Sequence, residues 1–232
     1  RSSREQLSNS SGKSSGPVSF MKGFDAFAGV IKSGGKTRRA AKMVILDVDH
    51  PDIREFIWCK VKEEKKAWAL IDAGYSSDMN GEAYASIFFQ NANNSVRLTD
   101  EFMKAALEGK KFALTARTNG AVIEEADAHE LLKEISEAAW LCGDPGVQMD
   151  TTIQKWHTCK NSDRIYATNP CSEFVFLDDT ACNLASLNLM KFRRPDGEFD
   201  IASFTHANDI MITAMEIIVG NSSYPNPAIE TR

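Results

Sequence analysis

The fold class is decided by Met43-Val44-Ile45-Leu46-Asp47-Val48, a short apolar run bounded by polar residues. A run of this length and composition is typical of a buried strand. Pro51 stands just after it, and proline is well suited to the first turn of a helix. The apolar residues that follow recur at helical spacing: Ile53, Phe56, Ile57 and Val61. The sequence therefore predicts a buried strand that leads into a helix beginning at Pro51.

Further helices are expected on both sides of this pair, from apolar spacing and from end signals. The expected ranges are 17–32, Thr99 or Asp100 to Glu108, Asp127 to Gly143, and 201–219. In the first of them the apolar residues at helical spacing are Phe20, Phe24, Phe27 and Ile31. The clearest of the four begins at Asp127, where Glu130 completes a capping box.

The remaining strand signals are short. Strand pieces are expected at 85–89, 95–98 and 112–116, whereas the charged and then turn-forming residues 64–82 predict a long loop or an insertion. Because strands alternate with helices along the chain, we expect an α/β fold with a mainly parallel sheet.

The composition excludes several classes of protein. With 232 residues, 43% of them hydrophobic, the chain can bury a sizeable core. A net charge of −5 argues against a nucleic-acid-binding surface. No apolar run approaches the roughly 18 residues of a membrane helix. Five cysteines, an odd number, without a secretory signal indicate reduced thiols. We therefore expect a cytoplasmic protein with no nucleic-acid and no membrane partner.

The most informative polar stretch is Asn169-Pro170-Cys171-Ser172-Glu173, with a second thiol at Cys182. If this stretch is extended, alternate side chains share one face, so an amide, a thiol and a carboxylate could meet one small substrate. Such a set suits chemistry on a polyol such as a ribose. A lone cysteine is more often a small buried hydrophobe beside a surface glutamate, but the combined pattern and the second thiol favour a chemical site.

These motifs resemble the active-site region of ribonucleotide reductases, and most closely the adenosylcobalamin-dependent class, class II. The stretches that carry the resemblance are Ser14-Ser15-Gly16, residues 32–41, His50-Pro51-Asp52-Ile53, residues 169–173, residues 179–189 and Tyr224-Pro225-Asn226-Pro227. The resemblance thus covers nearly the whole chain. It implies part of a ten-stranded α/β barrel with the radical cysteine on an interior loop. Residues 1–232 would form a partial catalytic barrel domain, an internal fragment truncated at both ends.

The resemblance also implies a role for each residue of the thiol motif. Cys171 would carry a thiyl radical that removes the hydrogen atom from C3′ of the ribose. Glu173 would take the proton of the 3′-hydroxyl, and partial burial would raise its pKa toward that task. Asn169 would hydrogen-bond the ribose hydroxyls and hold the sugar.

Reduction also needs two electrons, and by resemblance Cys182 is one member of the thiol pair that supplies them. We expect its partner to lie upstream of Arg1. The other cysteines, Cys59, Cys142 and Cys159, are expected to be small buried hydrophobes. A zinc site is disfavoured because no CxxC spacing occurs, so we expect no metal ligands.

A glycine-led basic loop lies at residues 33–41. Glycines let the backbone approach a ligand closely, and lysine and arginine favour phosphates or base edges, although a solvated basic turn is the commoner interpretation. The resemblance implies a loop that connects an effector deoxynucleotide with the substrate base, formed by Gly34, Gly35, Lys36, Arg38 and Arg39. It also implies a preceding effector-site loop within 7–16, which includes Lys13, Ser14, Ser15 and Gly16. Arg38 is expected to contact the substrate base or the effector.

The expected activity is thus the reduction of ribonucleotides to 2′-deoxyribonucleotides, with adenosylcobalamin as cofactor. The expected partners are a ribonucleotide substrate, a dNTP effector and a thioredoxin-like or glutaredoxin-like dithiol reductant, and a homodimer is allowed. Three alternatives stay open. They are a reductase that takes its radical from a separate metal-containing subunit, a non-catalytic nucleotide-sensing module, and a structural domain with merely buried thiols.

Overall fold

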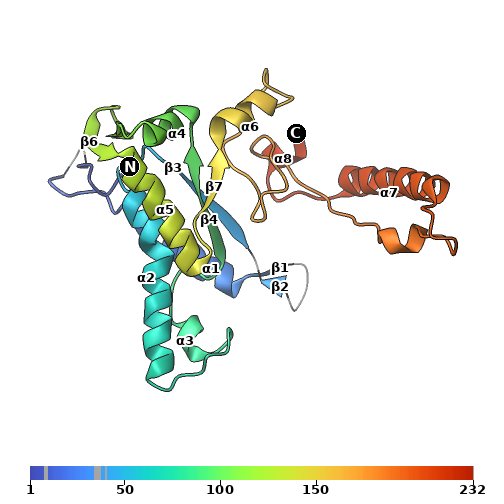
Figure 1. The fold of residues 1–232 in the computed structure, drawn as a ribbon, viewed down its shortest axis with the longest axis horizontal. Helices are drawn as coiled ribbons and strands as arrows, with labels where there is room; N and C mark the ends of the chain where they lie inside the picture. Colours follow the sequence, from blue (N-terminus) through green and yellow to red (C-terminus); the bar gives the residue numbers. More distant parts are fainter. Residues whose placement is uncertain (8–9, 34–37, 40, 232) are drawn as a thin grey trace. The chain divides into compact units, whose positions relative to one another are not determined.

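The computed structural model describes residues 1–7, 10–33, 38–39 and 41–231. The chain divides into two compact units, Arg1–Phe176 and Leu177–Arg232. Both are drawn in Figure 1. The predictions made for Gly34, Gly35 and Lys36 fall outside the described residues.

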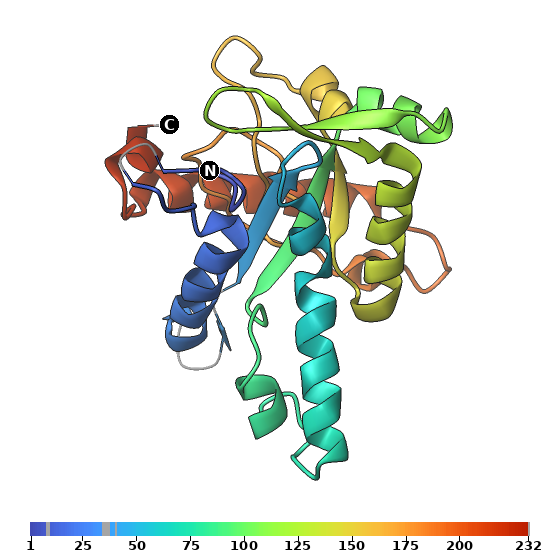
Figure 2. The same ribbon diagram turned by 90° about the vertical axis from the view of Figure 1, so that its left-hand side faces the viewer.

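The first unit is built on a parallel sheet of strands β3 (Lys42–Asp47), β4 (Ala92–Leu98) and β7 (Gly146–Met149), with β4 in the centre. Helices α2 (Ile53–Asp72) and α5 (Ala128–Cys142) cover one face of this sheet (Figure 2). Val96 and Leu98 of β4 are buried in the core beneath these helices. The α/β class and the parallel sheet are therefore confirmed, although the described residues do not close into a barrel.

The other elements of this unit flank the sheet. They are α1 (Gly16–Val30), β1 (Lys32–Ser33), β2 (Arg38–Arg39), α3 (Glu82–Ala85), α4 (Asp100–Leu107), β5 (Lys111–Thr115), β6 (Val122–Asp127) and α6 (Asp150–Trp156). Strands β1 and β2 pair antiparallel, as do β5 and β6.

The predicted helix ends are confirmed at α4 and α5. The Thr99 hydroxyl accepts a hydrogen bond from the Phe102 amide, and the Asp127 carboxylate accepts one from the Glu130 amide. Each bond satisfies an amide that the first turn of a helix leaves without a partner. Gly143, with a φ of +80°, ends α5 in the left-handed conformation.

Two predictions near α2 are wrong. The helix continues to Asp72, so residues 64–72 are not a loop: lysine, glutamate and alanine are good helix formers, and Ala67 is fully buried. Residues 85–89 are not a strand, since α3 ends at Ala85 and Phe89 has a positive φ of +66°. Strand β4 instead begins at Ala92, because its asparagines pair with β3.

Helix α1 is confirmed, but the side that it buries is not its phenylalanine face. The buried residues are Gly16, Val18, Met21, Asp25 and Ala28. Phe20, Phe24, Phe27 and Ile31 are all exposed, and we call this set the α1 apolar face.

The second unit contains a 3-10 helix η1 (Leu189–Phe192) and helices α7 (Ile201–Asn221) and α8 (Pro227–Thr231). The rings of Phe192, Phe199 and Phe204 pack together in it, with centroids 5.3 to 6.1 Å apart. Among the helices that the structure describes in either unit, none has the length and apolar character needed to cross a bilayer.

Candidate functional site

Asn169 closes a tight turn that contains the first thiol. Its carbonyl oxygen accepts a hydrogen bond from the Ser172 amide at 3.0 Å, and its side-chain Oδ1 accepts one from the Phe174 amide, also at 3.0 Å. Ser172 takes a left-handed φ of +63°. The expectation of an extended segment is therefore wrong, because the asparagine side chain offers the backbone a local alternative to strand pairing. We call residues 169–174 the thiol turn.

The thiol turn brings together three of the predicted catalytic residues. Cys171 and Glu173 are exposed, and Asn169 is half-buried. The partial burial expected for Glu173 is not supplied by the unit that contains it. Since Oδ1 of Asn169 already serves the turn, its amide nitrogen is the group that it can offer most freely to a ligand.

Side chains from the sheet hold the segment that leads into the thiol turn. Arg97 of β4 donates to the carbonyl oxygens of Ile165 and Tyr166, at 2.7 and 2.5 Å. Two further amide side chains, Gln148 of β7 and Asn93 of β4, each donate one hydrogen bond to this segment. These three residues lie outside the motifs from which the site was predicted. The alternation of polar and apolar side chains in β4 could have indicated Asn93 and Arg97, whereas Gln148 lies in β7.

Arg97 is itself fixed by a buried ion pair. Its Nε lies 2.6 Å from Oδ1 of Asp150, and both residues are buried. Burial alone would raise the pKa of Asp150, but hydrogen bonds from Arg97, Gln154 and Arg164 outweigh it and hold that pKa below its ordinary value. The guanidinium that binds the segment is therefore held in place by a charged partner.

A cavity of about 590 Å³ opens at the carboxyl ends of β3 and β4. Its polar lining comprises Asp47, Asp49, Arg97, Thr99, Glu101, Asp150, Arg164 and Tyr166. Ligands of open α/β sheets bind at this edge. Burial and the neighbouring Asp49 raise the pKa of Asp47. Because Arg97 and Tyr166 line it, the cavity borders the segment that leads to the thiol turn.

Cys182 belongs to the second unit. Its thiol is exposed and lies 3.8 Å from the Asn183 carbonyl oxygen. The Asn183 side chain donates to the Met215 carbonyl oxygen of α7 at 3.3 Å, which ties this stretch to the helix. All five cysteines are free thiols.

The other cysteines only partly match the expectation of buried hydrophobes. Cys59 is 4% exposed, and burial raises the pKa of its thiol to about 12. The Asn94 side chain donates to its sulfur at 3.4 Å. Cys142 and Cys159 are half-buried, so the expectation is confirmed for Cys59 alone.

The two histidines nearest the motifs bond locally. His50 is buried and its Nδ1 accepts a hydrogen bond from the Asp52 amide, whereas Nε2 of His157 lies 3.0 Å from the Asp163 carbonyl oxygen. In the part of the chain that the structure describes, no three potential ligands cluster as a metal site would require.

The predicted effector-site loop is tied together at its base. Gln6 and Lys13 pair as an isolated antiparallel bridge, and the Ser14 amide donates to the Glu5 carbonyl oxygen at 3.0 Å. Ser15 is the N-cap residue of α1, and Gly16 begins that helix with a φ of +73°. The loop is thus joined directly to the amino end of α1.

The basic loop follows the other end of α1. The backbones of Arg38 and Arg39 in β2 pair with Ser33 and Lys32 of β1, which makes these residues the base of a hairpin. The described parts of the two predicted effector loops therefore adjoin opposite ends of one helix (Figure 2).

Comparison with known proteins identifies the family of the chain. Residues 1–232 match the family model described as ribonucleotide reductase, barrel domain. A vitamin B12-dependent ribonucleotide reductase of Streptomyces avermitilis is 58% identical over 233 residues, which cover 99% of this chain and 24% of that protein. One from Rhodopirellula baltica is 59% identical over 231 residues, covering 99% and 22%.

A more distant relative is the vitamin B12-dependent ribonucleoside-diphosphate reductase of Mycobacterium tuberculosis. It is 31% identical over 229 residues, which cover 99% of this chain and 30% of that protein. The chain therefore spans only about a quarter of the length of its Streptomyces relative. Since the family model matches every residue from 1 to 232, the chain belongs to the ribonucleotide reductase family, within its barrel domain.

Proposed function

We propose that the whole protein containing this chain reduces ribonucleotides to 2′-deoxyribonucleotides by way of a thiyl radical on Cys171. The observation that carries the proposal is the thiol turn, in which an exposed thiol stands between Asn169 and Glu173 in a chain that matches the barrel domain throughout. In the whole protein this turn would be the loop inside the barrel.

The chemistry assigns one step to each side chain. The Cys171 sulfur radical takes the hydrogen atom from C3′ and becomes a thiol, while Glu173 takes the 3′-hydroxyl proton. The 2′-hydroxyl then leaves as water with the proton that Glu173 has taken, since the neighbouring radical makes that departure feasible. Cys182 and a second thiol supply two electrons and two protons and close to a disulfide: one hydrogen goes to C2′, and the remaining electron and proton, the proton returned through Glu173, restore the 3′-hydroxyl. Cys171 then returns a hydrogen atom to C3′.

Asn169 would orient the ribose through its amide nitrogen. Because Oδ1 is held by the Phe174 amide, the side chain is already fixed before substrate binds. Fixed groups of this kind place the reacting atoms without a further entropic cost at the moment of reaction.

The cofactor that we propose is adenosylcobalamin, on the basis of the relatives' names. When bound, it supplies a carbon-centred radical that takes the hydrogen atom of a thiol. The contribution of this chain is the Cys171 thiol, which fits that role because it is exposed and stands on a closed turn. His50 and His157 do not fit as cobalt ligands, since both are buried and bonded locally.

We further propose that a dNTP effector selects the substrate and that two copies of the protein form its site. The two effector loops are separated by a helix of 15 residues, which at about 1.5 Å per residue spans roughly 22 Å. That length exceeds a single deoxynucleotide. An antiparallel pair of α1 helices in a twofold dimer would bring loop 7–16 of one copy to the hairpin of the other. The α1 apolar face supplies the contact such a dimer needs.

The remaining partner is a reductant for the thiol pair of Cys182. We propose a thioredoxin-like or glutaredoxin-like dithiol protein in the cytoplasm, where thiols are kept reduced.

The experiment is an assay of ribonucleotide reduction by the purified whole protein with adenosylcobalamin and a dithiol, beside its Cys171→Ser variant. Turnover that requires cobalamin and vanishes in the variant is the expected result. Turnover only after a metal-containing subunit is added would instead assign a separate radical source. Binding of dNTP without turnover under either condition would favour a nucleotide-sensing module and overturn the proposal.

A further inference from the structure

The face of the sheet away from α2 and α5 carries a row of polar side chains. Successive side chains of a strand point to opposite faces, and Val96 and Leu98 of β4 point into the core beneath the helices. Asn93 and Arg97 therefore project from the other face. Gln148 of β7 joins them there, because it lies opposite Arg97 in the register of the two strands.

The segment 165–170, which leads into the thiol turn and begins it, is bound along this row in a fixed order. Arg97 holds Ile165 and Tyr166, Gln148 donates to the Thr168 hydroxyl at 2.9 Å, and Asn93 donates to the Pro170 carbonyl oxygen at 2.7 Å. The segment thus runs antiparallel to β4. From Arg97 to Asn93 the strand covers about 13 Å at about 3.3 Å per residue, the length of an extended chain from Tyr166 to Pro170.

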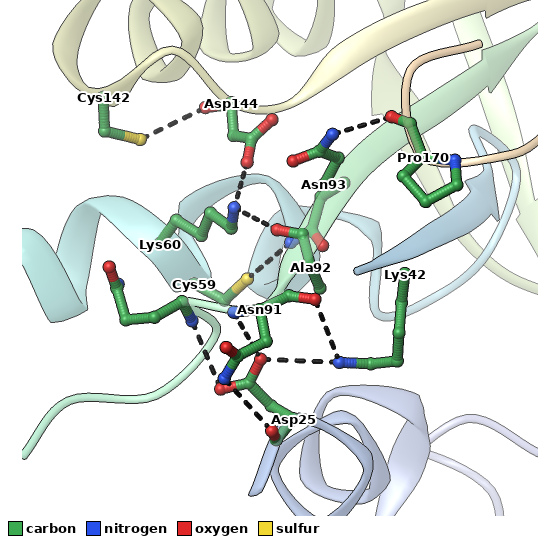
Figure 3. Close-up of polar contacts among 12 residues, drawn as sticks. Asp25, Lys42, Cys59, Lys60, Asn91, Ala92, Asn93, Cys142, Asp144 and Pro170 are labelled. Carbon is green, nitrogen blue, oxygen red and sulfur yellow. Dashed lines mark hydrogen bonds and ion pairs between the residues drawn. The ribbon is translucent and has the colours of Figure 1, made fainter. Parts of the chain in front are cut away.

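Asn93 makes the last of these contacts, immediately before Cys171 (Figure 3). The peptide group that joins Pro170 to Cys171 is planar. A hydrogen bond to the Pro170 oxygen therefore constrains the plane that carries the Cys171 nitrogen and Cα. On the other side the Ser172 and Phe174 amides return to Asn169, so the thiol is held from both directions.

We propose that Asn93 is a positioning residue for the Cys171 sulfur, a role that rests on the proposed function of that thiol. Arg97 and Gln148 hold the course of the segment, and Asn93 sets where it ends. Hydrogen-atom transfer depends steeply on the distance between the reacting atoms, and a misplacement of about 1 Å costs on the order of 100-fold in rate. A side chain with no contact to substrate can therefore control the rate of the reaction.

Asn93 can be tested because it is exposed, unlike Arg97, whose removal would leave the Asp150 charge buried without its partner. The variant is Asn93→Asp in the whole protein. Aspartate keeps the shape of the side chain but, when ionised, has no hydrogen to donate, and it repels the Pro170 oxygen. The matched control is Gln90→Glu, which makes the same chemical change in an amide that donates to the Phe88 carbonyl oxygen.

The first measurement is amide hydrogen exchange without substrate. We expect Asn93→Asp to speed exchange at residues 169–174, with the rest of the sheet and the melting temperature unchanged. The second is steady-state kinetics, in which kcat should fall by about 10- to 100-fold with little change in KM. Unchanged exchange in the thiol turn, or a kcat equal to that of Gln90→Glu, would overturn the positioning role.

These readouts separate the two proposals. Exchange in the thiol turn decides whether Asn93 holds it, whatever the reaction is. The comparison of wild type with Cys171→Ser decides whether Cys171 performs the proposed reaction. Suppose that Asn93→Asp loosens the thiol turn but the protein shows no Cys171-dependent turnover. Asn93 would then still hold the turn, but the proposed function would be wrong, and with it the role of Asn93 in catalysis.

Discussion

Gly16, in the predicted effector-site motif, leaves almost no room for a side chain. Its φ of +73° is one that side chains with a Cβ rarely adopt. A Cβ placed there would lie 2.7 Å from Oδ2 of Asp52 and 2.8 Å from Cβ of Ser3. Asp52 cannot move away freely, because it also accepts hydrogen bonds from Ser2 and Ser3. The glycine is therefore required by both conformation and packing.

We predict that Gly16→Ala destabilises the whole protein by about 2 to 4 kcal/mol, from backbone strain and from the displaced Asp52 network. The measurement is chemical denaturation. Gly109→Ala is the matched control, since Gly109 also has a positive φ, of +63°, but nothing lies within 4 Å of its Cβ position. Equal losses of unfolding free energy in the two variants would show that the close contacts of a Cβ at position 16 contribute nothing to the destabilisation.

Among the elements, the base of loop 7–16 depends on Glu5. Its carboxylate accepts hydrogen bonds from the Ser2 amide and from the amide and hydroxyl of Thr118, which lies in the turn between β5 and β6. Burial alone would raise the pKa of Glu5, but the bonds from Thr118 and Ser2 outweigh it and lower the pKa to about 2. The ionised form is therefore the one that the fold prefers.

The sign of the pH effect follows from this lowered pKa. The ionised Glu5 carboxylate stabilises the fold fully at pH values above 4.5, the ordinary pKa of the group, which applies to the unfolded chain. This stabilisation is lost as the pH falls toward about 2, the pKa in the folded protein. We predict that Glu5→Gln is less stable than wild type near neutral pH and that the difference narrows across that acid range. Melting curves of the two proteins at matched pH values measure it. A difference that stays constant with pH would contradict the prediction.

The sequence signals for helix ends predicted structure better than the signals for strands or loops did. The helix that begins after Asp127 was predictable because its cap, its apolar spacing and its terminal Gly143 all point to one structure. Residues 64–72 were predicted wrongly because a run of charged side chains is also typical of a loop. Helix α2 continues through them as a solvated helix that buries Ala67. At residues 169–174 the predicted extended segment is instead a turn, in which the Phe174 amide donates to Oδ1 of Asn169. The periodicity that predicts a strand does not indicate such a bond.

At the scale of the whole molecule, the α1 apolar face is an apolar surface that the described residues of its unit leave uncovered. Phe24 stands near its middle and is 60% exposed. We predict that Phe24→Glu in the whole protein weakens dimerisation by on the order of 100-fold or more, because a twofold contact loses about 1.5 to 3 kcal/mol at each of two copies. It should also abolish the effect of the dNTP on substrate choice.

Sedimentation equilibrium measures the first effect, and competition between two ribonucleotides with and without effector measures the second. The control is Leu107→Glu at the end of α4, a position that is 82% exposed and away from α1. If Phe24→Glu remains a dimer with normal effector response, the proposed arrangement of the α1 helices is wrong.

By itself the sequence determined the α/β class, the order of most elements and the motifs that carry Cys171 and Cys182, because these depend on neighbours in the chain. Only the tertiary structure decided that Asn93 and Arg97 hold the segment before Cys171. These contacts join residues 77 and 69 positions apart, and they exist only once the sheet has formed and the segment has folded across its polar face. The exposed side of α1 was decided in the same way, since periodicity identifies an apolar face but not the surface that covers it.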